Sequence, residues 1–142
     1  MFLQNSKPRA FIFDIDGTVA LRGDRGIFDF DNCAVDTRCE TAYALYKALV
    51  ISYPIIFLTG REDKHRIPTE TWLNYNGFGE RAGLYMRPTN NNNPDQEVKI
   101  QTYQTYVEPY YDIIGLIDDR QRVVDAYRAI GLTVLQIRPG DF

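Results

Sequence analysis

The residues best suited to chemistry follow a short apolar run near the amino terminus. Residues 10–13 read Ala-Phe-Ile-Phe, and Asp14 and Asp16 come directly after them, followed by Gly17 and Thr18. Four apolar residues in a row are typical of a buried strand, and side chains at positions i and i+2 of an extended chain point to the same side. Two carboxylates so close together repel each other unless a cation joins them, which indicates one shared site. In the alternative interpretation, Asp16 and Gly17 only turn the chain.

Two further apolar runs end in polar residues in the same way. Residues 53–58 precede Thr59, Gly60 and Arg61, and residues 113–117 precede Asp118 and Asp119. The carboxyl ends of parallel strands meet at one edge of a sheet. We therefore expect one crevice to collect the polar residues from all three strand ends, namely Asp14, Asp16, Thr59, Arg61, Asp118 and Asp119.

Helical patterns lie between these runs and must position them. Residues 37–40, Thr-Arg-Cys-Glu, match a capping box for a helix that ends near Ser52. A second helix is predicted with Pro68 in its first turn and a stop at Gly77, and Asn93-Pro94 should cap a third that carries Lys99. The remaining predicted elements are a helix over 121–130 and strands over 84–86 and 133–137. Alternating strands and helices predict an α/β fold, a Rossmann-like parallel sheet of about five strands with helices on both faces.

Size and charge limit the class of protein. The 142 residues predict a single domain, 1–142, and their net charge of −3 argues against a protein that coats nucleic acid along its length. Binding of a nucleic-acid end remains open. No apolar run approaches the length of a membrane span. Cys33 and Cys39 lack metal-site spacing and are expected to be buried, free thiols, which indicates a cytoplasmic protein.

Carboxylates without histidine or cysteine partners are a typical environment for Mg²⁺. A phosphate dianion 4 Å from one carboxylate would be repelled by about 8 kcal/mol at an effective dielectric constant near 20. Cations must offset this repulsion, and Lys99, Arg25 and Arg61 are the candidates besides the metal. One carboxylate of the Asp14–Asp16 pair could then attack phosphorus while the other protonates the leaving oxygen.

The sequence resembles the haloacid dehalogenase superfamily of aspartyl-phosphate phosphotransferases. The resemblance lies in residues 14–18, Thr59, Lys99 and the pair Asp118-Asp119, which occur in the family's order. Finer signals in residues 24–29, 59–62, 117–120 and 140–142 look closest to the 3′-phosphatase domains of bacteriophage polynucleotide kinase-phosphatases. The Gly-x-x-x-x-Gly-Lys-Ser/Thr loop that a kinase half requires is absent, so no kinase activity is expected from these residues.

The resemblance implies an Mg²⁺-dependent phosphomonoesterase that removes the 3′-phosphate from DNA or RNA ends through an aspartyl-phosphate. It implies Asp14 as nucleophile, Asp16 as acid and base, and Lys99 as a third catalytic residue. Substrate contacts are expected from Arg25, Thr59, Gly60 and Arg61, and metal contacts from Asp14, the backbone of Asp16, and Asp119 with Asp118 beside it.

Several interpretations stay open beside this one. The segment from Gly17 to Tyr53 holds one helix and one loop, which leaves no room for a substantial cap domain and predicts an open site. A small-molecule phosphatase of the same superfamily and a non-catalytic domain that binds phosphorylated ends are the alternative functions. His65 is expected on a surface loop, and the tyrosines near the third helix, including Tyr103 and Tyr106, are expected mainly to pack rather than to stack on bases.

Overall fold

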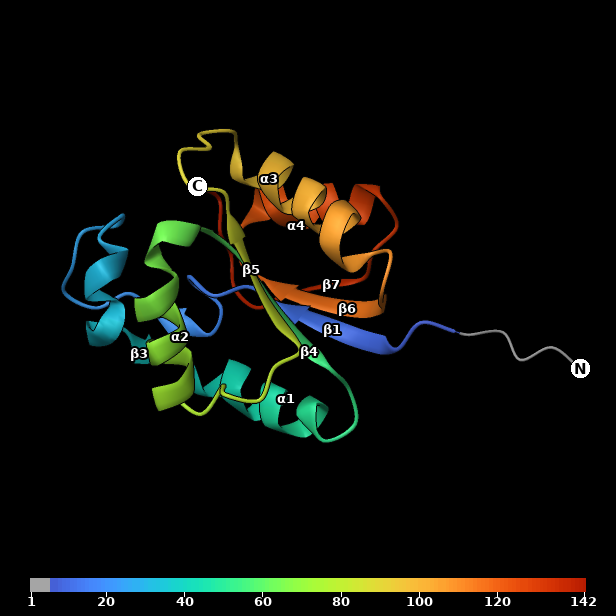
Figure 1. The fold of residues 1–142 in the computed structure, drawn as a ribbon, viewed down its shortest axis with the longest axis horizontal. Helices are drawn as coiled ribbons and strands as arrows, with labels where there is room; N and C mark the ends of the chain where they lie inside the picture. Colours follow the sequence, from blue (N-terminus) through green and yellow to red (C-terminus); the bar gives the residue numbers. More distant parts are fainter. Residues whose placement is uncertain (1–5) are drawn as a thin grey trace, which may run out of the picture.

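The computed structural model describes residues 6–142, which form one twisted parallel sheet between two pairs of helices (Figure 1). The strand order is β5-β4-β1-β6-β7, so the first strand lies at the centre. All neighbouring strands in this sheet pair in parallel. The strands are β1 (Arg9–Phe13), β4 (Ile55–Glu62), β5 (Gly83–Arg87), β6 (Asp112–Asp118) and β7 (Val134–Gln136). The predicted fold class is therefore confirmed.

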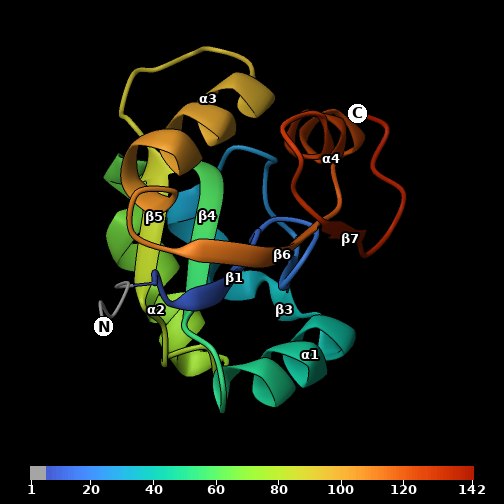
Figure 2. The same cartoon turned by 90° about the vertical axis from the view of Figure 1, so that its right-hand side faces the viewer.

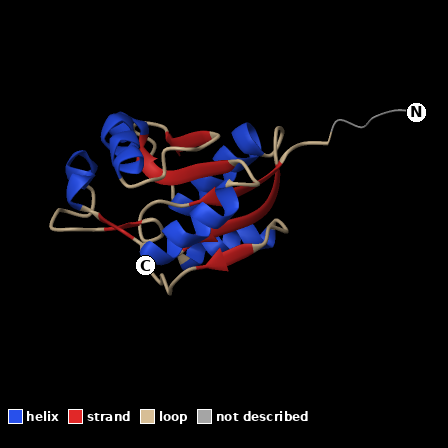
Figure 3. Ribbon diagram, turned by 90° about the horizontal axis from the view of Figure 1, so that it is seen from below, coloured by secondary structure: helices blue, strands red, loops and turns tan. Residues whose placement is uncertain are grey.

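Helices cover both faces of the sheet, as a parallel sheet with crossover connections requires. The helices α1 (Glu40–Val50) and α2 (Arg66–Tyr75) lie on one face, and α3 (Asp95–Thr102) and α4 (Gln121–Ala129) lie on the other (Figures 1 and 2). One π-helical turn, η3 (Tyr103–Val107), continues α3. Figure 3 shows the same layers from below. No helix among the described residues is long and apolar enough to cross a membrane.

The side chains of each strand point alternately to the two faces of the sheet, and the buried ones form two core clusters. Phe13 and Phe57 pack with Tyr46 of α1 and Trp72 of α2 on one face. Their sequence neighbours on the opposite face, among them Ile12, pack against α3, η3 and α4. Successive side chains of a strand point to opposite faces, so an all-apolar strand fills both clusters. This burial fixes the positions of the strand ends.

The segment between β1 and α1 forms a small excursion rather than a cap domain. Two short antiparallel strands, β2 (Ala20–Leu21) and β3 (Thr37–Arg38), close its base. A 3₁₀ helix, η1 (Phe30–Val35), lies within it and packs beside α2 (Figure 1). The thiol of Cys33 donates to the carbonyl oxygen of Pro68, and the indole of Trp72 donates to the carbonyl oxygen of Asp36. The excursion is thereby tied to the domain.

Three local predictions were wrong. Strand β4 continues through Thr59, Gly60 and Arg61 to Glu62, because its ladder with β5 resumes at Glu62 after an irregularity. The predicted capping box does not form, because Thr37 belongs to β3, and Cys39 precedes α1 without a side-chain cap. Asn93 does not cap α3 either, since that helix begins after Pro94 with no side-chain cap bond. The expected burial of both free cysteines is confirmed.

Candidate active site

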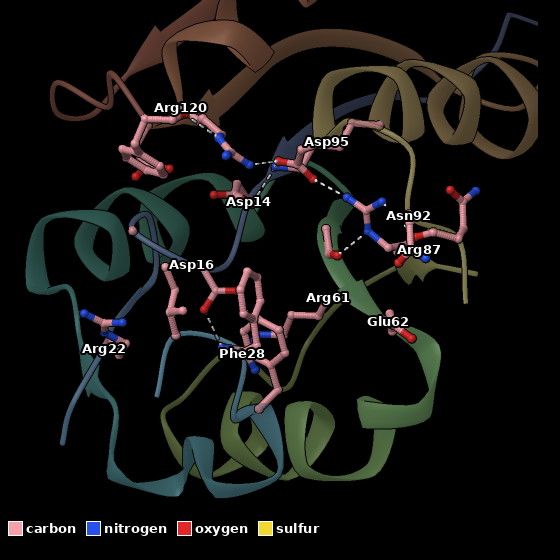
Figure 4. A pocket seen from close by; sticks show the side chains of 18 of the residues that line it. Asp14, Asp16, Arg22, Phe28, Arg61, Glu62, Arg87, Asn92, Asp95 and Arg120 are labelled. Carbon is pink, nitrogen blue, oxygen red and sulfur yellow. Dashed lines mark hydrogen bonds and ion pairs between the residues drawn. The ribbon is translucent and has the colours of Figure 1, made fainter. Parts of the chain in front are cut away.

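A cavity of about 480 Å³ opens at the carboxyl ends of β1 and β4. Its lining comes from the ends of β1, β4 and β5, from the excursion, from α3 and the loop before it, from the residues just before α4, and from Phe142. Figure 4 shows ten of these residues with labels. The predicted site residues that line it are Asp14, Asp16, Arg25, Gly60, Arg61, Lys99 and Asp119. The sheet edge thus brings together side chains from distant parts of the chain.

Lys99 lies at the centre of a buried ionic cluster. Its Nζ donates to Asp14 Oδ1 at 2.8 Å and to Asp118 Oδ2 at 2.9 Å. Although burial lowers the pKa of Lys99, the carboxylates of Asp118 and Asp14 raise it well above its ordinary value. The ammonium therefore stays charged and holds the carboxylate of Asp14, whose other oxygen accepts a bond from the Thr18 hydroxyl at 3.1 Å.

Both carboxylate oxygens of Asp118 accept hydrogen bonds from other groups of the protein. Besides its bond to Lys99, its Oδ1 accepts the backbone N–H groups of Asp119 and Arg120 at 2.8 and 3.1 Å. Such a turn ends β6 and starts the approach to α4. Asp118 is not among the residues that line the cavity, whereas Asp119 is.

The chemistry of this cluster suits a hard divalent cation. Asp14, Asp118 and Asp119 each offer a carboxylate oxygen, and these oxygens lie within 4.8 Å of one another. Burial and the neighbouring Asp118 raise the pKa of both Asp14 and Asp119. Three carboxylates share one ammonium, so negative charge is in excess. Oxygen ligands without histidine or cysteine are those that Mg²⁺ prefers, and the cluster therefore fits that ion.

Glycine at position 17 is required by both conformation and space. Its φ of +80° lies in the left-handed region, and a Cβ atom there would collide with the carboxylate of Asp119. The backbone after Asp16 can therefore approach Asp119 closely. The Asp-x-Asp-Gly sequence places the first and last acidic strand ends in one site.

A second ionic network joins β4 to the excursion. Arg61 donates to both oxygens of Asp16, from Nε at 2.9 Å and from Nη2 at 2.8 Å. Arg25 makes the same two-bond contact with Asp36, at 2.8 and 2.7 Å. Asp36 also lies 3.5 Å from Arg61. Both predicted phosphate-binding arginines thus face the cavity but are already paired with carboxylates.

An aromatic ring supports the two guanidinium groups. Phe30 lies 5.2 Å from the guanidinium carbon of Arg25 and 5.0 Å from that of Arg61, both measured to the ring centroid. The rings of His65 and Phe30 pack in a T-shaped arrangement with their centroids 5.4 Å apart, and His65 Nδ1 lies 2.8 Å from Asp31 Oδ1. His65 therefore belongs to a supporting layer at the end of the short 3₁₀ helix η2 (Asp63–His65), rather than to an open surface loop.

A third network fixes the start of α3. Arg87 donates to the carbonyl oxygens of Gly60 at 2.8 Å and Asn91 at 3.0 Å, and to Asp95 at 3.3 Å. Asp95 also lies 3.3 Å from Arg120. Burial opposes ionisation of Asp95, but Lys99, Arg120 and Arg87 outweigh it and lower its pKa. These bonds tie the start of α3, the helix that carries Lys99, to Arg87 at the end of β5 and to Arg120 just before α4.

Besides Asp118, two groups of predicted residues lie outside the cavity. Thr59 is buried, and its hydroxyl accepts the backbone N–H of Arg61 at 3.2 Å, so a contact with substrate stays a prediction. The tyrosines near the third helix are also absent from the lining. Tyr103 is buried as expected, whereas Tyr106 is more than half exposed and stacks on Tyr85.

Sequence reasoning missed four residues that shape the site: Asp36, Arg87, Asp95 and Arg120. Asp95 precedes Lys99 by one helical turn, a spacing at which opposite charges meet, and this signal could have identified it. Asp36 lies between two elements without a local pattern. Its role depends on folding of the excursion.

Comparisons with known proteins agree with this geometry. The model of the family described as the polynucleotide kinase PNKP phosphatase domain matches residues 8–142. A protein of Autographa californica nuclear polyhedrosis virus, named as a bifunctional polynucleotide kinase/RNA ligase, is 32% identical over 120 residues, which are 82% of this chain and 17% of that protein.

Two solved structures of Pnkp1/Rnl/Hen1 complexes, one described as an RNA repair complex, both superpose with a TM-score of 0.92. They are 30% and 31% identical, cover 100% and 98% of this chain, and are themselves covered over 46% and 49%. The chain spans less than half the length of each of these relatives.

Proposed function

Because the chain belongs to the family of polynucleotide kinase PNKP phosphatase domains of haloacid dehalogenase type, we propose that it removes the 3′-phosphate from polynucleotide ends. The observation that carries the proposal is the position of Asp14. This carboxylate is buried, is held by Lys99 and Thr18, and lines the same cavity as Asp16. A nucleophile and an acid–base partner are thus both available to one phosphate.

In the first step, an oxygen of Asp14 attacks phosphorus and the bond from phosphorus to the 3′-oxygen breaks. Asp16 gives its proton to that oxygen, so a 3′-hydroxyl end leaves. In the second step, water attacks phosphorus and gives a proton to Asp16, and the bond from phosphorus to the Asp14 oxygen breaks. Inorganic phosphate is released, and the carboxylate of Asp14 is restored. The side chain of Asp16 is 40% exposed, which leaves it accessible to substrate and water.

The pairing of Asp16 with Arg61 sets a condition on this mechanism. Arg61 bonds to both oxygens of Asp16, whereas a general acid needs one oxygen free to hold the proton that it donates. A phosphate that enters the cavity competes for the guanidinium, because its oxygens accept the same pair of N–H groups. Arg61 thereby transfers its bonds to the substrate and leaves the oxygens of Asp16 free to act as acid and base.

Asp14, Asp119 and the backbone carbonyl oxygen of Asp16 are the ligands we assign to Mg²⁺. The bound ion supplies positive charge that offsets the repulsion between carboxylate and phosphate. Asp118 holds Lys99 instead of lining the cavity. Asp119 and Asp118 thus have different roles in this proposal, whereas the sequence-based prediction placed both residues at the metal.

A small-molecule phosphatase is the second candidate, and the size of the cavity favours it. A volume of about 480 Å³ is within the range of small-ligand sites. The short segment between β1 and α1 forms no cap domain over the cavity, however, so a longer chain can extend from it. The two functions differ in their activity on mononucleotides relative to oligonucleotides.

The test is phosphate release from matched oligonucleotides that carry either a 3′- or a 5′-phosphate, with a 3′-mononucleotide alongside. We expect release from the 3′-phosphate in the presence of Mg²⁺ and phosphate bound to protein after an acid quench. Asp14→Asn should abolish both signals, and Asp24→Asn, an exposed carboxylate outside the cavity, should abolish neither. Release from the 5′-phosphate, or equal efficiency on mononucleotide and oligonucleotide, would overturn the proposal.

A further inference from the structure

Three exposed apolar side chains line the cavity. One of them, Phe142, is covered on one face by the guanidinium of Arg120, and the other two, Ile27 and Phe28, are neighbours in the chain. Ile27 is 59% exposed and Phe28 is 78% exposed, and both line the cavity that contains Asp14. Figure 4 shows Phe28 on the side opposite Asp95 and Arg120. The chain therefore places an uncovered aromatic ring in a site otherwise lined mainly by charged groups.

A tight turn holds the two side chains outward. The N–H of Asp29 donates to the carbonyl oxygen of Gly26 at 3.1 Å, which places Ile27 and Phe28 at the two central positions of a β-turn. These positions usually hold glycine, proline, asparagine or aspartate. Isoleucine and phenylalanine do not favour such a turn, so the turn itself does not explain why these two side chains are present.

The turn is fixed before any ligand arrives. Arg25 Nη1 donates to the carbonyl oxygen of Gly26 at 3.0 Å, while its other nitrogens hold the buried carboxylate of Asp36. Phe30, just beyond the turn, packs on Arg25 as well. Little conformational freedom of the backbone would be lost when a ligand covers Phe28.

The occupant that fits is a flat ring carried on a phosphate ester. A phosphate near Asp14 fills only part of the cavity, and the attached nucleoside would extend toward the mouth, where Phe28 lies. Nucleobases stack on aromatic side chains irrespective of their identity. Arg22 lines the same mouth, and within residues 6–142 no hydrogen bond or ion pair involves its guanidinium. It is placed to meet the next phosphate of the strand.

We propose that Phe28 is a stacking platform for the base of the terminal nucleotide, and that it makes the enzyme prefer base-bearing ends without selecting a sequence. This inference rests on the proposed function and names the part of the substrate that this wall of the site recognises. Ile27 widens the platform, and Arg22 directs the strand away from the cavity.

The experiment compares two oligonucleotides that differ only in their last residue, which is either a normal nucleotide or an abasic sugar, each with a 3′-phosphate. In the wild type, kcat/KM should be roughly 5- to 100-fold higher for the base-bearing end, through KM. Phe28→Ala should remove most of that ratio by weakening the base-bearing substrate alone, and Phe28→Trp should retain it. The control is Tyr75→Ala, which removes a 90% exposed aromatic ring of α2 outside the cavity.

The outcomes separate this inference from the proposed function. If Phe28→Ala lowers activity equally on both ends, the residue acts only on the structure of the excursion and the platform is refuted. An unchanged ratio refutes it as well. If the wild type instead hydrolyses 5′-phosphates, the 3′ assignment fails, and the same pair of ends with 5′-phosphates still measures stacking on Phe28.

Discussion

Replacement of Lys99 by methionine should destabilise the protein strongly, and removal of a nearby carboxylate should reverse part of the loss. The Lys99 side chain is 2% exposed and bonds to Asp14 and Asp118. Methionine retains most of the volume but leaves three buried carboxylates without their ammonium. The effect is electrostatic, so a change in charge elsewhere in the cluster should compensate it.

The magnitude follows from the distances. An ion pair at 2.8 Å gains about 6 kcal/mol at an effective dielectric constant of 20, before desolvation is subtracted. Loss of one partner from a buried pair usually costs about 3–5 kcal/mol. Two carboxylates within 4.8 Å repel each other by at least about 3.5 kcal/mol on the same scale, and uptake of a proton relieves part of this.

The assay is urea unfolding at pH 7 in the presence of a chelator. Lys99→Met should lower the free energy of unfolding by about 3–5 kcal/mol. Asp119→Asn removes one like charge from the cluster, so the double variant should regain about 2 kcal/mol. Lys47→Met, at an exposed position of α1, is the control and should change stability by less than about 0.5 kcal/mol.

The double variant decides whether the reasoning holds. If Lys99→Met with Asp119→Asn were no more stable than Lys99→Met alone, repulsion among the carboxylates would not be the cause of the loss. Poor packing of the methionine would then explain it. Added Mg²⁺ gives an independent check, because it should stabilise the Lys99 variant more than the double variant.

Three further predictions concern the metal, the arginine and pH. Asp119→Ala should raise the Mg²⁺ concentration for half-maximal activity more than Asp118→Ala does, because Asp119 borders the cavity. If a Mg²⁺ titration gives the reverse order, Asp118 and not Asp119 is the metal ligand. Arg61→Lys should lower kcat/KM on a 3′-phosphorylated oligonucleotide at least about 10-fold, because an ammonium cannot make the paired contact, and an unchanged value would exclude that contact from catalysis. Asp95 has a pKa below its ordinary value of 3.8 in the folded protein, so its stabilisation is present at neutral pH and lost as pH falls through the folded pKa. The stability difference between wild type and Asp95→Asn should therefore shrink below about pH 4, and a difference that stays constant from pH 7 to pH 3 would contradict this.

The parallel sheet and the polar residues that gather at its carboxyl edge could be predicted from the sequence. Apolar runs that end in acidic residues predict buried strands, and parallel strands must place those ends together. Asp14, Asp16 and Asp119 could be assigned to one site for this reason alone. Lys99 needed one more argument, because excess negative charge at a phosphate site requires a fixed cation.

The pairing of the charged side chains, in contrast, depends on the three-dimensional fold. Lys99 and Asp14 are 85 residues apart, and Arg61 and Asp16 are 45 apart, so no local pattern indicates that they bond. Asp36 holds Arg25 only because the excursion folds back onto α2. The orientation of Asp118 toward Lys99, and of Asp119 toward the cavity, depends on the turn that starts α4. Periodicity fixes which face a side chain leaves from, whereas its ionic partner depends on which distant elements pack there.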